Sequence, residues 1–281
     1  MKLISFTKMV ASGNDFVVID EEKNNKLQLS KERIKAICNR KYGVGADGLM
    51  FIKNTHTGQP VVKFYNADGS SGALCGNGSR CIVNYIAGVT GEKDKSINFV
   101  FNDKNYTGFI NSDGQPLFYL HEPVKIIVNK KIKFKDKIIS GDFIDVNAPH
   151  FIINIDETTG LWEENPELNS LDIFKIGKQI RYAGEFQPEG TNVNFIRIEN
   201  NNISIRTYER GVEDETLSCG TGSVSAAISA FLHGKVKPPV EIMTKSGEKL
   251  LVNFNYVNKK FNKLTLTGSA KEVFSGKFIL N

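Results

Sequence analysis

Residues 75–79 read Cys-Gly-Asn-Gly-Ser, and residues 219–223 read Cys-Gly-Thr-Gly-Ser. The two segments are separated by about half of the 281-residue chain. Each is followed by apolar residues at helical spacing, which end near Gly88 in the first half and near Gly234 in the second. This internal repeat predicts two similar halves, each with a cysteine in a glycine turn at the start of a buried helix.

Short runs rich in β-branched and aromatic residues surround these helices and predict strands. The runs lie at residues 16–19, 61–65, 97–101, 151–155, 193–198 and 203–207. One more helix is expected to begin at the cap residue Ser30 and to stop at Gly43. Strands outnumber helices, so we expect an α+β fold of two pseudo-symmetric domains, with a boundary near residues 120–123.

The composition excludes several classes of protein. The chain has 36 basic and 31 acidic residues, a mild surplus of +5 without the dense basic stripe that nucleic-acid binding requires. No apolar stretch approaches the roughly 18 residues of a membrane span, and no signal-peptide core follows Met1. We therefore expect a cytoplasmic enzyme that binds neither nucleic acid nor membrane.

The four cysteines, Cys38, Cys75, Cys81 and Cys219, are too few for a disulfide scaffold and form no Cys-x-x-Cys pair. We expect thiols, without a metal site. A cysteine ahead of a helix meets unpaired backbone N–H groups and the positive end of the helix dipole, which favour its thiolate. The same N–H groups can bind a carboxylate, and Gly76 and Gly220 let a ligand approach the backbone closely.

Two such cysteines suit the inversion of a carbon centre. One thiolate removes a proton from one face while the other thiol returns a proton to the opposite face. With an ordinary pKa of roughly 8.5, a helix-activated pair can hold one thiolate and one thiol at the same time. Donors aimed at the α-carboxylate would stabilise the carbanion, so no pyridoxal phosphate or other cofactor is required.

Two other interpretations are weaker. Residues 43–48 match the dinucleotide pattern Gly-x-Gly-x-x-Gly, but they follow a predicted helix and lead into a strand, which is the reverse of the required order. A cysteine hydrolase would need a histidine base. His56, His121 and His233 lie in loop-like or helix-end contexts, and only His150, beside Pro149, has the setting of a site residue.

Over nearly its whole length the sequence resembles the diaminopimelate epimerase family. The matching segments are residues 13–16, 66–70, 75–78, 149–150, 190–195, 208–213 and 219–222. The resemblance implies conversion of LL-2,6-diaminopimelate to meso-diaminopimelate, for lysine biosynthesis and peptidoglycan precursors. It also implies two domains, each a sheet wrapped around a central helix, with the active site in the cleft between them. Residues 1–122 and 268–281 would form the N-terminal domain with the Cys75 loop, and residues 123–267 the C-terminal domain with the Cys219 loop.

The resemblance also implies residue roles. Cys75 and Cys219 would exchange the proton, and His150 and Glu209 would tune their pKa values. The reacting carboxylate would meet Gly76, Asn77, Gly220 and Thr221. The distal end of the substrate would meet Asn66, Asn192 and Arg210, and the reacting amine would meet Asn14 and Glu209. The expected partner is a small-molecule amino-acid substrate, and a homodimer is the oligomeric state that we consider.

Two positions depart from the family pattern. Ala148 stands where Asn is frequent before Pro-His, and Gly48 stands where Gln is frequent. Neither residue can donate a side-chain hydrogen bond to a substrate. The alternatives are therefore a racemase of another amino acid, such as histidine or proline, and a non-catalytic amino-acid-binding relative.

Overall fold

The computed structural model describes residues 2–24, 27–72, 75–91, 95–158, 161–162 and 166–280. It divides into two compact units, one formed by Met1–Tyr119 with Thr267–Asn281 and the other by Leu120–Leu266. Residues 120–122 thus belong to the second unit and Thr267 to the first, where the sequence led us to expect the reverse. Leu120 joins the second unit because its N–H donates to the carbonyl of Leu264, at 2.8 Å.

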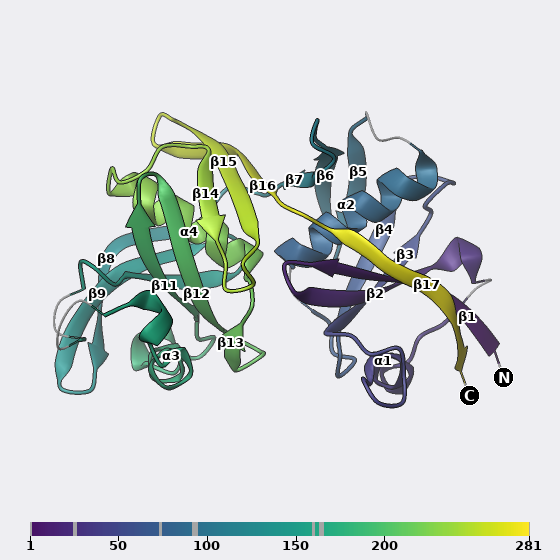
Figure 1. Cartoon of the computed structure of the whole chain (residues 1–281), viewed down its shortest axis with the longest axis horizontal. Helices are drawn as coiled ribbons and strands as arrows, with labels where there is room; N and C mark the ends of the chain where they lie inside the picture. Colours follow the sequence, from purple (N-terminus) through teal and green to yellow (C-terminus); the bar gives the residue numbers. More distant parts are fainter. Residues whose placement is uncertain are drawn as a thin grey trace. The chain divides into compact units, whose positions relative to one another are not determined.

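The first unit is a mixed sheet built from the N-terminal strands and the last strand of the chain (Figure 1). Its strands are β1 (Lys2–Ala11), β2 (Asn14–Asp20), β3 (Gly48–Lys53), β4 (Val61–Asn66), β5 (Ile97–Phe101), β6 (Lys104–Ile110), β7 (Pro116–Tyr119) and β17 (Lys271–Leu280). They pair in the order β17-β1-β2-β3-β4-β5-β6-β7. The helices are α1 (Lys31–Cys38) and α2 (Gly76–Thr90), with a 3-10 turn at Glu21–Lys23.

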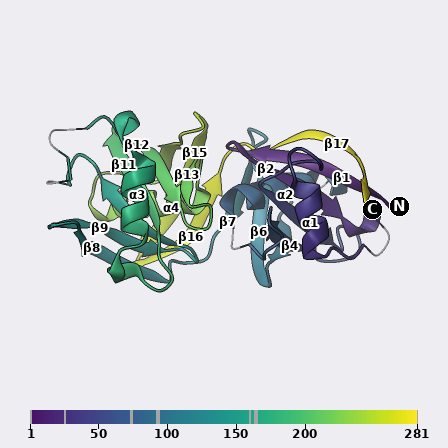
Figure 2. The ribbon, with the colours of Figure 1, turned by 90° about the horizontal axis from the view of Figure 1, so that it is seen from below.

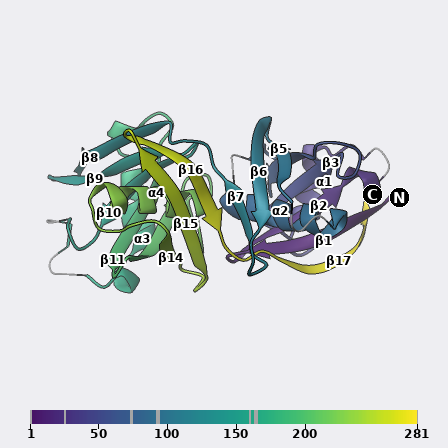
Figure 3. The same cartoon turned by 90° about the horizontal axis from the view of Figure 1, so that it is seen from above.

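The second unit has the same plan. Its strands are β8 (Lys125–Phe134), β9 (Lys137–Asp145), β10 (Pro149–Asn154), β11 (Asn192–Glu199), β12 (Asn202–Glu209), β13 (Asp214–Thr216), β14 (Val240–Met243), β15 (Lys249–Val257) and β16 (Lys260–Thr267). Its helices are α3 (Ile173–Arg181) and α4 (Gly220–Leu232), with 3-10 turns at Leu168–Ser170 and Gly184–Phe186. Figure 2 shows α3 against β12, and Figure 3 shows β15 beside β16.

The pairing senses establish the internal repeat. In the first unit, β2 pairs with β3 in parallel, β3 with β4 antiparallel, and β4 with β5 in parallel. In the second unit, β10 with β11, β11 with β12, and β12 with β14 follow the same sequence of senses. The helix α2 connects β4 to β5, and α4 connects β12 to β14. The prediction of two similar α+β halves is confirmed.

Each central helix is enclosed by strands. In the first unit α2 contacts β1, β2, β5, β6, β7 and β17, and in the second α4 contacts β9, β10, β11, β12, β14 and β15. Every residue of α4 from Gly220 to Ala230 is buried. A helix that is covered all round needs small or apolar residues on every face, and Gly, Ser and Ala supply them here. The glycine loops therefore begin the most buried helix of each unit.

The predicted helix ends are partly right. Ser30 caps α1 as expected, since its hydroxyl accepts from the N–H of Arg33, but α1 stops at Cys38, well before Gly43. Gly88 does not end α2, which continues to Thr90 because Gly91, at φ +72°, takes the left-handed conformation that ends a helix. The second cysteine helix does stop ahead of Gly234, at φ +69°. Within the described ranges, none of the helices has the length and apolarity of a membrane span.

Candidate functional site

In the first unit, Cys75 is the N-cap of α2. Its backbone is extended, at φ −109° and ψ 109°, and its Sγ accepts a hydrogen bond from the N–H of Gly78 at 3.3 Å. Gly76 and Asn77 follow in the first turn, where helix geometry leaves the backbone N–H groups without carbonyl partners inside the helix. The half-buried thiol and these donors form the anion-binding end of a buried helix.

Asn14 faces the Cys75 sulfur, and its orientation is set by a carboxylate. The Nδ2 of Asn14 donates to Oδ2 of Asp47 at 2.6 Å, so its Oδ1 is the atom that lies 3.7 Å from Cys75 Sγ. An ionised carboxylate only accepts hydrogen bonds, and it therefore fixes which end of the amide turns toward the sulfur. Asn14, which the resemblance assigns to the reacting amine, thus lies beside Cys75.

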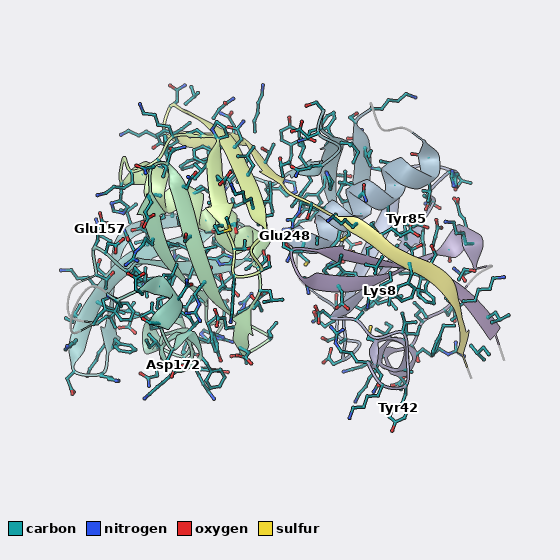
Figure 4. All side chains as sticks on the ribbon, viewed as in Figure 1. Lys8, Tyr42, Tyr85, Glu157, Asp172 and Glu248 are labelled. Carbon is teal, nitrogen blue, oxygen red and sulfur yellow. The ribbon has the colours of Figure 1, made fainter. Side chains whose placement is uncertain are left out.

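Asp47 belongs to a charged cluster that sequence reasoning missed. Arg40 bridges Asp15 and Asp47 at 2.8 and 2.6 Å, and Lys8, labelled in Figure 4, pairs with Asp15 at 2.7 Å. Burial alone would raise the pKa of Asp15, but hydrogen bonds from Arg40 and Lys8 hold it well below its usual range. The cluster keeps acidic acceptors in place behind Asn14.

Arg80 is a second residue that the pattern did not reveal. It lies in α2 and is fully buried, and its guanidinium donates to the carbonyl of Gly76 at 3.2 Å, to Oδ1 of Asn77 at 3.0 Å and to Oγ of Ser12 at 2.9 Å. These bonds fix the first turn of α2 from inside the unit. A signal was present in the sequence, since an arginine one turn beyond the loop stands within a buried helical pattern.

In the second unit, Cys219 is the N-cap of α4 with nearly the same backbone, at φ −122° and ψ 109°. Its Sγ lies 3.6 Å from Oγ1 of Thr221, and that oxygen lies 2.9 Å from Nε2 of His150. The N–H of Ser223 donates to the carbonyl of Cys219, as Ser79 does to Cys75 in the first unit. His150, expected to act on the thiols, therefore reaches Cys219 through one hydroxyl.

His150 begins the buried run of β10 and has no exposed surface. Burial and, as a smaller contribution, the nearby Arg210 cation lower its pKa to about 3. The ring is therefore neutral at physiological pH, with one nitrogen as donor and the other as acceptor. Its Nδ1 lies 3.0 Å from Nδ2 of Asn194, a buried residue of β11 that the sequence did not single out.

The third residue after each cysteine is a glycine in crowded surroundings. A Cβ on Gly78 would lie 3.2 Å from Sδ of Met50 and 3.5 Å from Sγ of Cys75. A Cβ on Gly222 would lie 3.3 Å from both Cβ of Cys219 and Cε1 of His150. The repeated second glycine thus leaves room for side chains that pack against the helix start.

Asn192, Glu209 and Arg210 lie at adjacent strand ends of the second unit. Asn192 donates from Nδ2 to the carbonyl of Pro149 and accepts the N–H of Arg210 at Oδ1, both at 2.8 Å. The hydroxyl of Thr216 donates to Oε2 of Glu209 at 2.8 Å. Asn192 was expected at the distal end of the substrate. In this structure it holds the backbone of Arg210.

The Arg210 guanidinium donates to one acceptor in the described part of the chain, the carbonyl of Glu189 at 3.2 Å. Arg210 also lines a cavity of about 510 Å³ within the second unit, together with Lys125, Asp145 and Gly190. A planar guanidinium with open donors suits a carboxylate, which it can bind through two parallel hydrogen bonds.

Asn66 and the two departures from the family pattern have local explanations. Asn66 ends β4, is exposed, and donates to the hydroxyl of Ser70 in its own turn at 3.0 Å. Gly48 begins β3 under Phe64, and a Cβ there would lie 2.5 Å from a carbon of that ring. The Phe64 ring thus occupies the space of a longer side chain. Ala148 is buried ahead of Pro149.

The remaining cysteines and histidines lie outside these sites. All four cysteines are thiols. Cys38 is buried in α1, and burial raises its pKa to about 11. His56, His121 and His233 are all exposed, and the Nε2 of His233 lies 2.9 Å from the buried carboxylate of Asp142. Within the described residues, no three His, Cys, Asp or Glu side chains are arranged to hold a metal ion.

Comparison with known proteins covers nearly the whole chain. The model of the family described as diaminopimelate epimerase matches residues 6–126 and 143–273. A diaminopimelate epimerase of Aquifex aeolicus is 36% identical over 294 residues, covering 98% of this chain and 97% of that protein. One from a Hydrogenobaculum species is 38% identical over 284 residues, covering 96% of each. The chain belongs to the diaminopimelate epimerase family.

Solved structures extend this likeness at the level of the fold. A hydroxyproline epimerase from Agrobacterium vitis superposes with a TM-score of 0.68 at 13% identity, covering 98% of this chain and 92% of that one. A probable proline racemase from Agrobacterium radiobacter K84 gives a TM-score of 0.69 at 14% identity, covering 99% and 93%. The epimerase-family fold therefore recurs in proteins of very different sequence.

Proposed function

We propose that the protein interconverts LL-2,6-diaminopimelate and meso-diaminopimelate, with Cys75 and Cys219 as its two acid–base groups. The observation that carries the proposal is that each cysteine caps the buried central helix at the same point of a repeated fold. One such cysteine could be a packing residue. Two at equivalent places supply the matched acid and base that inversion of a carbon centre needs.

The chemistry follows from these groups. One thiolate takes the α-proton, and the electron pair of the C–H bond passes to the carbon and its carboxylate. The other thiol gives its proton to the opposite face and becomes the new thiolate, so the reverse reaction uses the same groups in exchanged roles. Backbone N–H groups at Gly76, Asn77, Gly220 and Thr221 stabilise the charge that develops on the carboxylate.

The distal end of the substrate sets the specificity in this proposal. Arg210 binds the distal carboxylate with its open donors, Asn192 holds the Arg210 backbone, and Asn66 adds a polar contact from the other unit. Asn14 and Glu209 contact the reacting amine. His150 and Glu209 adjust the pKa values of the cysteines.

The proposal is tested in deuterated buffer without pyridoxal phosphate. LL-diaminopimelate should yield meso-diaminopimelate with deuterium at the inverted carbon, while proline and histidine should not exchange. Cys75→Ala and Cys219→Ala should each abolish turnover and keep the fold. Cys38→Ala is the matched control, because this buried thiol belongs to α1 and to neither cysteine loop. Full turnover in either site variant would reject the two-base mechanism.

We also propose a cytoplasmic homodimer. Reducing conditions keep thiols from forming disulfides, which suits a catalytic pair of cysteines. Leu3 of β1 and Ile279 of β17 are direct cross-strand partners, yet they are 59% and 52% exposed. Val273 and Phe274 of β17 are exposed as well. An outward apolar patch of this kind suits a second copy of the chain. Light scattering should give twice the 31.3 kDa chain mass, and Leu3→Asp should halve it.

A further inference from the structure

The hydrogen bonds behind Cys219 form a continuous series across three neighbouring strands. Thr207 of β12 donates from Oγ1 to Oδ1 of Asn194 at 2.9 Å, and Asn194 places Nδ2 3.0 Å from Nδ1 of His150. His150 and Thr221 follow at 2.9 Å, and Thr221 and Cys219 at 3.6 Å. Asn194 and Thr207 face each other in the β11–β12 ladder, and both are buried.

We infer that Asn194 is a positioning residue that fixes His150 as the tautomer with hydrogen on Nε2. In that tautomer the Thr221 hydroxyl donates a hydrogen bond to the sulfur of Cys219. An Asn194 Nδ2 group can only donate, and Nδ1 of His150 must then accept. The ring hydrogen is left on Nε2, which donates to Oγ1 of Thr221. The hydroxyl hydrogen of Thr221 is thereby free to point at the sulfur.

The direction of this series matters because a thiolate only accepts hydrogen bonds. With the opposite tautomer, Nε2 would accept the Thr221 hydrogen, and Cys219 would face an oxygen lone pair. That arrangement favours the thiol over the thiolate. Asn194 therefore supports the ionised form of Cys219 without touching substrate. The inference rests on the proposed function only in treating Cys219 as an acid–base group.

The tautomer can be observed directly, without any assay of activity. Nitrogen NMR of histidine-labelled protein distinguishes protonated from unprotonated ring nitrogens, and the chain has four histidines, so His150 can be assigned with His150→Gln. The wild type should show hydrogen on Nε2 and none on Nδ1. Asn194→Asp supplies an acceptor and should place a hydrogen on Nδ1. Hydrogen on Nδ1 in the wild type would overturn the inference, whether or not the enzyme is an epimerase.

A double-mutant cycle separates positioning from mere packing. Asn194→Leu should lower kcat by about tenfold, the loss expected for one hydrogen bond to a charged group, with KM nearly unchanged. In a protein that already carries Thr221→Val, Asn194→Leu should lower kcat little further, because the series of hydrogen bonds is already broken. Asn202→Leu, at an exposed position of β12, is the matched control and should leave kcat unchanged. Full additivity of the two losses would contradict the inference.

Discussion

Gly222 and Asn194 lie so close that no side chain fits between them: a Cβ on Gly222 would be 2.5 Å from Oδ1 of Asn194. Gly222 belongs to the first turn of α4, and Asn194 belongs to β11. Their contact brings the cysteine loop against the strand that orients His150. The second glycine of the repeated motif is thus required by a neighbour that lies 28 residues earlier in the chain, within segment 190–195.

Gly222→Ala should therefore lower activity and stability together. Overpacking of this kind lowers the free energy of unfolding by about 1–3 kcal/mol. The displaced Asn194 should also lose its hydrogen bond to His150. We expect urea unfolding to show the destabilisation and kcat to fall by about tenfold or more. Gly88→Ala in α2 is the matched control, since nothing lies within 4 Å of its Cβ position. The free energy of unfolding of this control should rise by about 0.5–1 kcal/mol, because alanine is more favourable than glycine inside a helix. An active, equally stable Gly222→Ala protein would contradict the crowding.

His150 should make the protein sensitive to acid. Its pKa falls from 6.5 to about 3 on folding because the ring is buried. Below pH 6.5 the unfolded chain therefore binds a proton that the folded chain does not, and stability falls as the pH drops toward about 3. The slope from this one group is at most about 1.4 kcal/mol per pH unit. Unfolding free energies of His150→Gln, measured across this range, should vary less with pH than those of wild type, while exposed His56→Gln should follow wild type. Parallel curves for all three would argue against the low pKa.

Arg210→Lys should weaken selection of a substrate with a second carboxylate. Lysine cannot reproduce the two parallel hydrogen bonds of a guanidinium. We expect kcat/KM for diaminopimelate to fall by at least about tenfold, equivalent to roughly 1.4 kcal/mol. Residual activity on an amino acid without a distal carboxylate should change little. Equal losses on both kinds of substrate would make Arg210 part of the scaffold.

Oxidation should inactivate the enzyme reversibly. Under the proposed mechanism the two thiols act on opposite faces of one carbon, which predicts that Cys75 and Cys219 can form a disulfide once the substrate has left. Mass mapping after mild oxidation should find this bond, and a reductant should restore activity. Cys38 should stay unmodified, since burial raises its pKa to about 11. A disulfide between Cys75 and any cysteine other than Cys219 would contradict the proposal that these two thiols act on the same carbon.

The sequence predicted most of this fold because its signals are local. The glycine loops, the apolar helix pattern and the β-branched runs gave both central helices and strands β2, β4, β5, β10, β11 and β12. Gly88 was misread because a glycine inside a helix looks like a stop, and only the φ of Gly91 shows which of the two ends α2. The short helix α3 has an interrupted apolar pattern and was missed.

The site was predictable only where the motif itself contains the functional residue. Cys75, Cys219 and the amides of their loops belong to the repeat, so their place was readable. Asn194 and Asp47 act through residues distant in sequence, and no pattern in the chain connects them with those neighbours. Arg80 acts on the first turn of its own helix, where its place within a buried helical pattern was a signal. Asn192 was assigned to substrate by resemblance, and nothing in the sequence indicated its hydrogen bonds to the carbonyl of Pro149 and from the N–H of Arg210.

The last strand has a consequence for biosynthesis. Strand β17 pairs with β1 along its length, from Lys271 with Val10 to Leu280 with Lys2, and so takes the place that β8 fills in the second unit. The second unit can assemble from a continuous stretch of nascent chain. The first unit begins earlier in the chain, but its edge strand β17 follows the whole of the second unit. Synthesis from the N-terminus therefore supplies all the strands of the second unit before it supplies the last strand of the first.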